Sequence, residues 1–134
     1  MSEPLFPPIE AIIDIHTELL AEHGGASGLR DRGGLEASLA RGRQMLAYSE
    51  ESTICDLAAA ICVSLCRNHP FVDGNKRAAF AALGITLGLN GLALDVSERE
   101  AIRVMLAVAA GKMDEATFRA WVTKNSIPDE PSSR

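Results

Sequence analysis

Apolar residues recur at helical spacing along most of this chain. The first such segment begins at Ile9, stays apolar on one face through Leu20, and is ended by Gly24-Gly25. Glycine-rich residues up to Gly34 follow as a predicted loop. Further helices are predicted over 35–48, 53–67, 75–89, 97–110 and a last segment opened by Asp114. The pattern therefore predicts an all-α fold.

The helix predicted over 75–89 differs from the others because it is apolar on every side beyond Arg77. A helix without a polar face is normally buried inside a protein. We therefore expect it to be the central helix of a bundle, with only its charged start facing solvent. The next helix is predicted to begin with a capping box formed by Ser97 and Glu100.

Length and composition agree with one helical domain. The chain has 134 residues, which is enough to bury a core without disulfides or metal. Hydrophobic residues make up 47% and aromatic residues only 4%, so the core is expected to be built from small aliphatic side chains. We expect a single domain over 1–134, with an ordered core over about 9–123 and a flexible tail over 126–134.

The charge balance excludes some classes of function. The formal net charge is -5, whereas proteins that bind DNA or RNA usually gather lysine and arginine. No direct nucleic-acid contact is therefore expected, which argues against a nuclease. No uncharged apolar run is long enough for a membrane span, and the start, Met-Ser-Glu-Pro, lacks the basic region of a signal peptide. A cytoplasmic protein without membrane contact is expected.

Candidate chemistry gathers in the string His-Pro-Phe-Val-Asp-Gly-Asn-Lys-Arg, residues 69–77. Pro70 disfavours helical geometry in the residue before it, so one helix should end there and another begin near Gly74. The first amides of a helix have no partners inside the helix and attract anions. This placement favours a triphosphate as the ligand.

Each residue of the string has a plausible task in phosphoryl transfer. Asp73 offers a hard oxygen ligand for Mg²⁺, and His69 is left as the general base. Donors and cations for the phosphates would come from Gly74, Asn75, Lys76 and Arg77. Taken singly, the same residues also fit a helix cap or a solvated helix face.

The string resembles the signature of the Fic/Doc family, His-x-Phe-x-(Asp/Glu/Asn)-(Gly/Ala)-Asn-x-Arg, and matches it at every defined position. The resemblance extends over about 9–123 and includes the segments 24–31 and 35–39. It implies a Fic/Doc-like helical bundle around the helix that follows the motif. It also implies that His69 is the base, Asp73 the metal ligand, and residues 74–77 the phosphate-binding group.

Two positions depart from the branch of the family that transfers AMP. Lys76 replaces a second glycine, and Phe80 replaces a second arginine. A lysine there should obstruct the AMP-transferring pose and favour a reversed nucleotide that presents its γ-phosphate. The resemblance then implies a Doc (death-on-curing) toxin that uses ATP and Mg²⁺ to phosphorylate elongation factor Tu and inhibit translation. An AMP transferase and a non-catalytic nucleotide- or partner-binding module remain alternatives.

The resemblance also implies partners and a flap. Some Fic proteins silence themselves through a helix reading (Ser/Thr)-x-x-x-Glu-(Gly/Asn), a string that this sequence lacks. Restraint would come from a cognate, Phd-like antitoxin whose flexible C-terminal segment folds beside the active site. The loop up to Gly34 would be the flap, in which Arg30 contacts the target or the nucleotide. Otherwise Arg30 is a solvated charge and Asp31 caps the next helix.

The cysteines and the other histidines receive simpler interpretations. Cys55, Cys62 and Cys66 share one helix face and, with His69, resemble half of a metal site. Burial as small core residues is the favoured account. His16 and a second histidine at position 23 have no companion ligands and are assigned no role.

Overall fold

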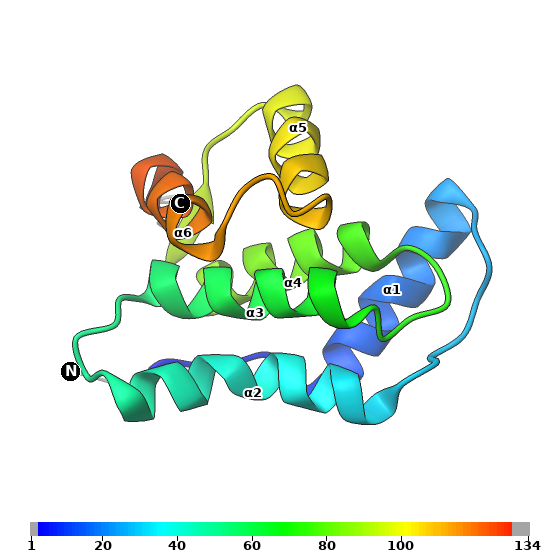
Figure 1. Cartoon of the computed structure of the whole chain (residues 1–134), viewed down its shortest axis with the longest axis horizontal. Coiled ribbons are helices and arrows are strands. Elements are labelled where there is room, and N and C mark those ends of the chain that lie inside the picture. The colour runs from blue at the N-terminus through cyan, green and yellow to red at the C-terminus, as the bar shows by residue number, and fades with distance from the viewer. Residues whose placement is uncertain (1–2, 130–134) are drawn as a thin grey trace, which may run out of the picture.

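The computed structural model describes residues 3–129, and helices dominate this part of the chain (Figure 1). In chain order they are α1 (Ile9–His23), α2 (Arg32–Tyr48), α3 (Ile54–Asn68), α4 (Asn75–Leu89), α5 (Glu98–Ala109) and α6 (Glu115–Asn125). Two short strands, β1 (Leu92–Leu94) and β2 (Ser126–Pro128), pair in one small sheet. The predicted all-α fold is confirmed. Between residues 3 and 129, no helix is long and apolar enough to cross a membrane.

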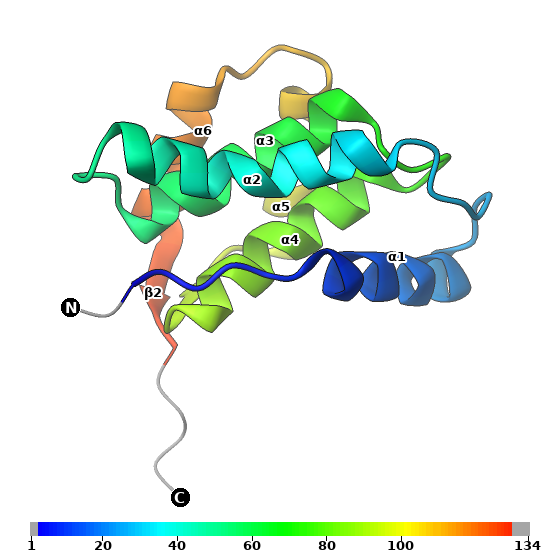
Figure 2. The ribbon, with the colours of Figure 1, turned by 90° about the horizontal axis from the view of Figure 1, so that it is seen from below.

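Helix α3 occupies the middle of the molecule. It packs against α2 on one side and α4 on another, while α5 and α6 cover it from above in the view of Figure 1. Figure 2 shows α4 lying between α3 and α1. Ala58, Ala59 and Ala60 of α3 are fully buried, and such small side chains let neighbouring helices approach closely.

Helix α4 is the buried helix expected after the motif, but it is not buried on every side. Its buried residues are Ala78, Ala79, Ala82, Leu83, Thr86 and Leu87. Gly84, Gly88 and Leu89 are exposed, so the prediction that only the charged start faces solvent was wrong. The difference arises because α1 and α3 cover two sides of α4 and leave a third side open.

Helix α2 begins earlier than the sequence pattern indicated. It starts at Arg32 rather than at residue 35, and the Asp31 side chain caps it by accepting a hydrogen bond of 2.8 Å from the Gly34 amide. Gly33 and Gly34, which the sequence pattern predicted to lie in the loop, therefore lie in the first turn of the helix. The alternative role of Asp31 as a helix cap is confirmed.

The capping boxes also differ from the expectation. Ser97 accepts a hydrogen bond of 3.1 Å from the Glu100 amide, as predicted. The Glu100 carboxylate binds Arg103 at 2.9 Å instead of returning to the cap, so only half of the box forms. A complete box joins Thr53 and Asp56 at the start of α3.

Strand β2 lies where the sequence predicted the beginning of a flexible tail. Its residues Ser126–Pro128 run antiparallel to β1, with Leu92 opposite Pro128. The Asp129 amide then donates a hydrogen bond of 2.9 Å to the carbonyl of Gly91. The structure thus differs from the expectation over 126–129, because β1 offers a strand edge for pairing. The rest of that expected tail, 130–134, lies outside the described residues.

The cysteines fill the core, as favoured from the sequence. Cys55, Cys62 and Cys66 are 8%, 0% and 2% exposed. Within residues 3–129, no group of three or more histidine, cysteine or acidic side chains is arranged to hold a metal ion. The alternative of a cysteine metal half-site is therefore excluded for this part of the chain.

Candidate active site

The motif forms the connection from α3 to α4. Helix α3 ends at Asn68, and His69 follows in the left-handed conformation with φ 47° and ψ 56°. Gly74 takes a similar left-handed conformation, φ 75° and ψ 21°, immediately before α4 begins at Asn75. Glycine adopts this geometry without strain. The predicted break and restart of the chain are confirmed.

The N-terminus of α4 is left without a side-chain cap. Side chains cap α2, α3, α5 and α6 at their first turns, whereas none caps α1 or α4. The first amides of α4 belong to Asn75, Lys76 and Arg77, and such amides carry the positive end of the helix dipole. This end of α4 can therefore accept an anion.

The carboxylate of Asp73 lies beside this helix start. One oxygen accepts a hydrogen bond of 2.8 Å from the Gly74 amide, and the other accepts one of 3.3 Å from the Ala26 amide. These hydrogen bonds, first that from Gly74, hold the pKa of Asp73 below its ordinary value, and the charges of Lys76 and Arg77 add to the effect. Asp73 is thus an ionised oxygen donor with lone pairs to spare. Such a donor fits Mg²⁺, which usually takes one or two carboxylates and completes its shell with phosphates and water.

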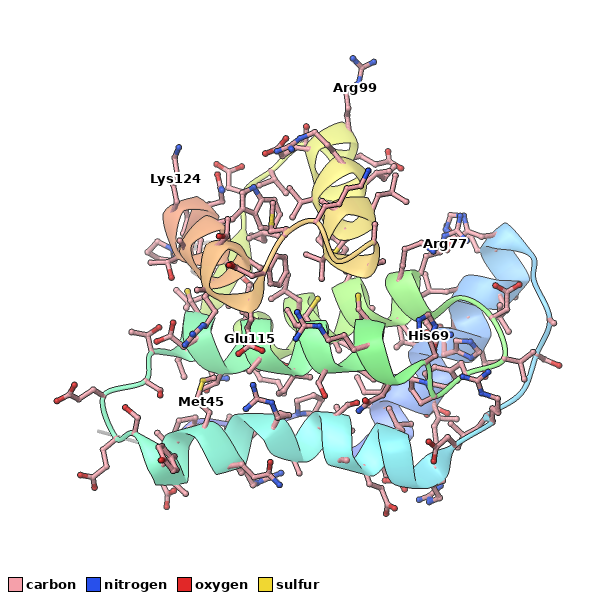
Figure 3. All side chains as sticks on the ribbon, viewed as in Figure 1. Met45, His69, Arg77, Arg99, Glu115 and Lys124 are labelled. Atoms are coloured by element: carbon pink, nitrogen blue, oxygen red, sulfur yellow. The ribbon has the colours of Figure 1, made fainter. Side chains whose placement is uncertain are left out.

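His69 and the two cations lie at this same end of the molecule. Figure 3 shows His69 and Arg77 near the junction of α3 and α4, beside the loop that follows α1. The side chains of Lys76 and Arg77 are exposed, and no ion pair within residues 3–129 engages either of them. They are available to phosphate oxygens.

The side chain of Asn75 braces the motif loop from the first residue of α4. Its side-chain oxygen accepts a hydrogen bond from the Phe71 amide, and its side-chain nitrogen donates one to the Phe71 carbonyl, both at 2.9 Å. Both ends of the amide group are therefore engaged in bracing the motif loop. The side-chain nitrogen donates one hydrogen bond and has a second N–H, so the expected donation from Asn75 to a phosphate stays a prediction.

His16, to which the sequence analysis assigned no role, contacts the motif from α1. Its ring is 3% exposed and stacks on Phe71 with ring centroids 3.7 Å apart. Its Nε2 lies 2.7 Å from the carbonyl oxygen of Asp73, which requires the proton on Nε2. The only sequence signal was a histidine among apolar positions of α1, and that signal did not reveal its partner.

The loop between α1 and α2 is attached to the motif by its backbone. Leu29 and Phe71 form an isolated antiparallel bridge. The Val72 amide donates to the carbonyl of Gly28 at 3.0 Å. Gly25 has φ 124°, and a Cβ there would lie 2.9 Å from an Asp73 carboxylate oxygen. The glycines of this loop thus allow it to lie directly against the motif.

The guanidinium of Arg30 also faces the motif. It donates to the backbone carbonyl of His69, from the loop between α1 and α2. The expected contact of Arg30 with a target or nucleotide stays a prediction, because the structure shows a contact within the protein.

A cleft of about 590 Å³ lies at the other end of α3 and contains no motif residue. Its walls come from α2, the following loop, the start of α3 and α6, and include Arg41, Tyr48, Asp56 and Arg119. The motif residues therefore lie outside this cleft, at the opposite end of α3.

Comparisons with known proteins agree with the motif and the fold. A model described as the Fic/DOC family matches residues 6–87. "Toxin Doc" of Mycolicibacterium smegmatis is 40% identical over 105 residues, which cover 75% of this chain and 80% of that protein. "Protein kinase doc" of Escherichia phage P1 is 32% identical over 83 residues, which cover 62% of this chain and 66% of that protein. The chain belongs to the Fic/DOC family, and the relatives it resembles are of the Doc type.

Proposed function

We propose that this protein is a Doc-type toxin that transfers the γ-phosphate of ATP to a hydroxyl group of a protein substrate. The observation that carries the proposal is the uncapped start of α4, where an ionised Asp73 and two exposed cations meet. The similarity to a relative named "Protein kinase doc" supports phosphoryl transfer.

The residues of the motif divide the reaction among them. His69 accepts the proton of the attacking hydroxyl, the hydroxyl oxygen forms a bond to the γ-phosphorus, and ADP leaves with the electrons of the broken bond. Amides at the start of α4 bind phosphate oxygens, together with Lys76 and Arg77. Asp73 would hold Mg²⁺, which neutralises charge on the phosphates when it is bound.

AMP transfer is the second candidate, and specific residues speak against it. Lys76 stands in the first turn of α4, where the AMP-transferring branch has a glycine. Phe80 packs against the hydrophobic core, where that branch has an arginine for phosphate. Both differences favour a nucleotide that presents its γ-phosphate. A module that binds nucleotide or partner without catalysis is the third candidate.

The proposed target and partner follow from the family. Elongation factor Tu is the proposed substrate, and its phosphorylation would inhibit translation in the cytoplasm. A cognate, Phd-like antitoxin is the proposed partner, since a relative is named "Toxin Doc". Co-purification with the product of the neighbouring gene tests this pairing.

The mass of intact elongation factor Tu, measured after incubation with the protein, Mg²⁺ and ATP, tests the reaction. A gain of one phosphate is expected, and the His69→Ala variant should abolish it. The matched control is His23→Ala, which removes an exposed histidine at the end of α1 and should keep full activity. A gain of AMP would establish the second candidate. No gain in mass would reject elongation factor Tu as the substrate and leave the binding module.

A further inference from the structure

His69 has an unusual backbone conformation. Within residues 3–129, it is the only residue other than glycine with a positive φ, at 47°. A side chain in the left-handed region crowds the following carbonyl, so surrounding contacts must hold it there. The proposed general base therefore depends on whatever fixes its backbone.

The residue after His69 limits the backbone conformations that His69 can adopt. Pro70 disfavours the right-handed helical conformation of its predecessor. His69 is thereby left with an extended or a left-handed backbone. The Cα–Cβ bond of His69 points in a different direction in each of these two backbone conformations, and the imidazole follows it. Selecting one of them decides where the base points.

The loop between α1 and α2 supplies contacts that favour the left-handed conformation. The Pro70 carbonyl accepts hydrogen bonds from the amides of Arg30 and Asp31, at 2.8 and 2.9 Å. These backbone bonds fix the chain just after His69. The carbonyl of His69 itself is bound by the Arg30 guanidinium, a charged donor and hence a strong one.

We propose that Arg30 is a positioning residue, which holds His69 in its left-handed conformation and thereby orients the imidazole for proton transfer. The catalytic part of this proposal rests on the proposed function, whereas the backbone part does not. Because backbone amides make the other bonds, truncating Arg30 removes one contact and leaves the loop attached. The side chain thus acts on the base without touching substrate.

The structural half of the test uses nuclear magnetic resonance. The chain has only three histidines, at positions 16, 23 and 69, so their ring signals can be assigned by substitution. In Arg30→Ala, we expect the backbone chemical shifts of His69 to move towards extended values and its ring signals to change. The ring signals of His16 and His23 should stay in place. Unchanged His69 signals would overturn the proposal.

The kinetic half separates positioning from substrate contact. Small misplacements of a reacting group cost up to about a hundredfold in rate, so Arg30→Ala should lower kcat about ten- to a hundredfold with KM for ATP and target unchanged. Arg30→Lys should recover part of the rate, since an ammonium can donate to the same carbonyl as a point charge. A raised KM with an unchanged kcat would overturn the proposal, because Arg30 would then bind substrate.

Arg32→Ala provides the matched control. It removes the same charge two positions away, from an exposed pair with Glu10 at 3.5 Å, and should leave both readouts unchanged. An equal loss in this variant would show a general effect of charge and refute positioning. If the wild-type protein transfers no phosphate, the proposed function fails, while the resonance measurement still decides whether Arg30 fixes His69. If Arg30→Ala does not fold, Arg30→Met takes its place, because it keeps an aliphatic stem and removes the donor to the His69 carbonyl.

Discussion

Replacing His16 by alanine tests whether this residue of α1 stabilises the motif, as its contacts indicate. The variant loses the stack on Phe71, 3.7 Å between ring centroids, and the hydrogen bond of 2.7 Å to the Asp73 carbonyl. An aromatic stack is worth about 0.5–1.5 kcal/mol beyond burial, and a hydrogen bond about 1 kcal/mol. Deleting a ring that is 3% exposed also leaves a cavity. We expect the free energy of unfolding to fall by about 3 kcal/mol.

Two further variants separate the contributions. His16→Phe keeps a ring on Phe71 and loses only the donor, so about 1–2 kcal/mol should be lost as the Asp73 carbonyl loses its partner. His23→Ala removes a histidine from the exposed end of the same helix and should change stability by no more than about 0.5 kcal/mol.

Urea titration at equal protein concentration measures all three differences. A loss below about 0.5 kcal/mol in His16→Ala would refute the argument, since that is the range of ordinary surface substitutions. If the phenylalanine variant lost as much as the alanine variant, the stack on Phe71 would contribute nothing.

Two shorter predictions concern the motif itself. His69→Gly should be more stable than His69→Ala by about 1 kcal/mol, because glycine adopts a φ of 47° without strain; equal urea midpoints would contradict this. Asp73 should keep its affinity for Mg²⁺ when the pH falls from about 7 to about 5, since its pKa lies below the ordinary value of about 3.9. Because this pKa is lowered, the contribution of Asp73 to stability is fully present above its unfolded pKa and is lost as the pH falls through its folded pKa. Calorimetry that showed a loss of Mg²⁺ binding between about pH 7 and about pH 5 would disprove Asp73 as the metal ligand.

Local signals in the sequence predicted the helices well. Helix α4 begins and ends where Gly74 and the Asn90-Gly91 pair indicated, because left-handed glycines and a proline act on the nearest residues. Helix α2 was misjudged at its start because Gly33 and Gly34 resemble a loop. The start of α2 is fixed by one contact, the hydrogen bond from the Gly34 amide to the Asp31 carboxylate three residues earlier.

Non-local contacts were beyond the reach of the same reasoning. Strands of three residues have no periodicity, and β1 pairs with a segment more than thirty positions along the chain. The spacing of residues in the sequence likewise could not show that His16 stacks on Phe71, or that the Asn75 side chain makes hydrogen bonds to the backbone of Phe71. The motif identified which residues gather, whereas only the fold revealed which of them support the others.

The turn at Asn90 and Gly91, after α4, influences the order in which segments of the molecule fold and unfold. Asn90 binds both backbone groups of Leu5 through its side chain, and Gly91 accepts the amide of Asp129. The bonds between Asn90 and Leu5 join residues 85 positions apart, and the bond between Gly91 and Asp129 closes a smaller loop over 91–129, whereas the contacts among α2, α3 and α4 join neighbours in sequence. Large loops cost more entropy to close, so these outer segments should dock last during folding and detach first. Since α4 separates them from the motif by about 20 Å, such fraying would leave the catalytic end undisturbed.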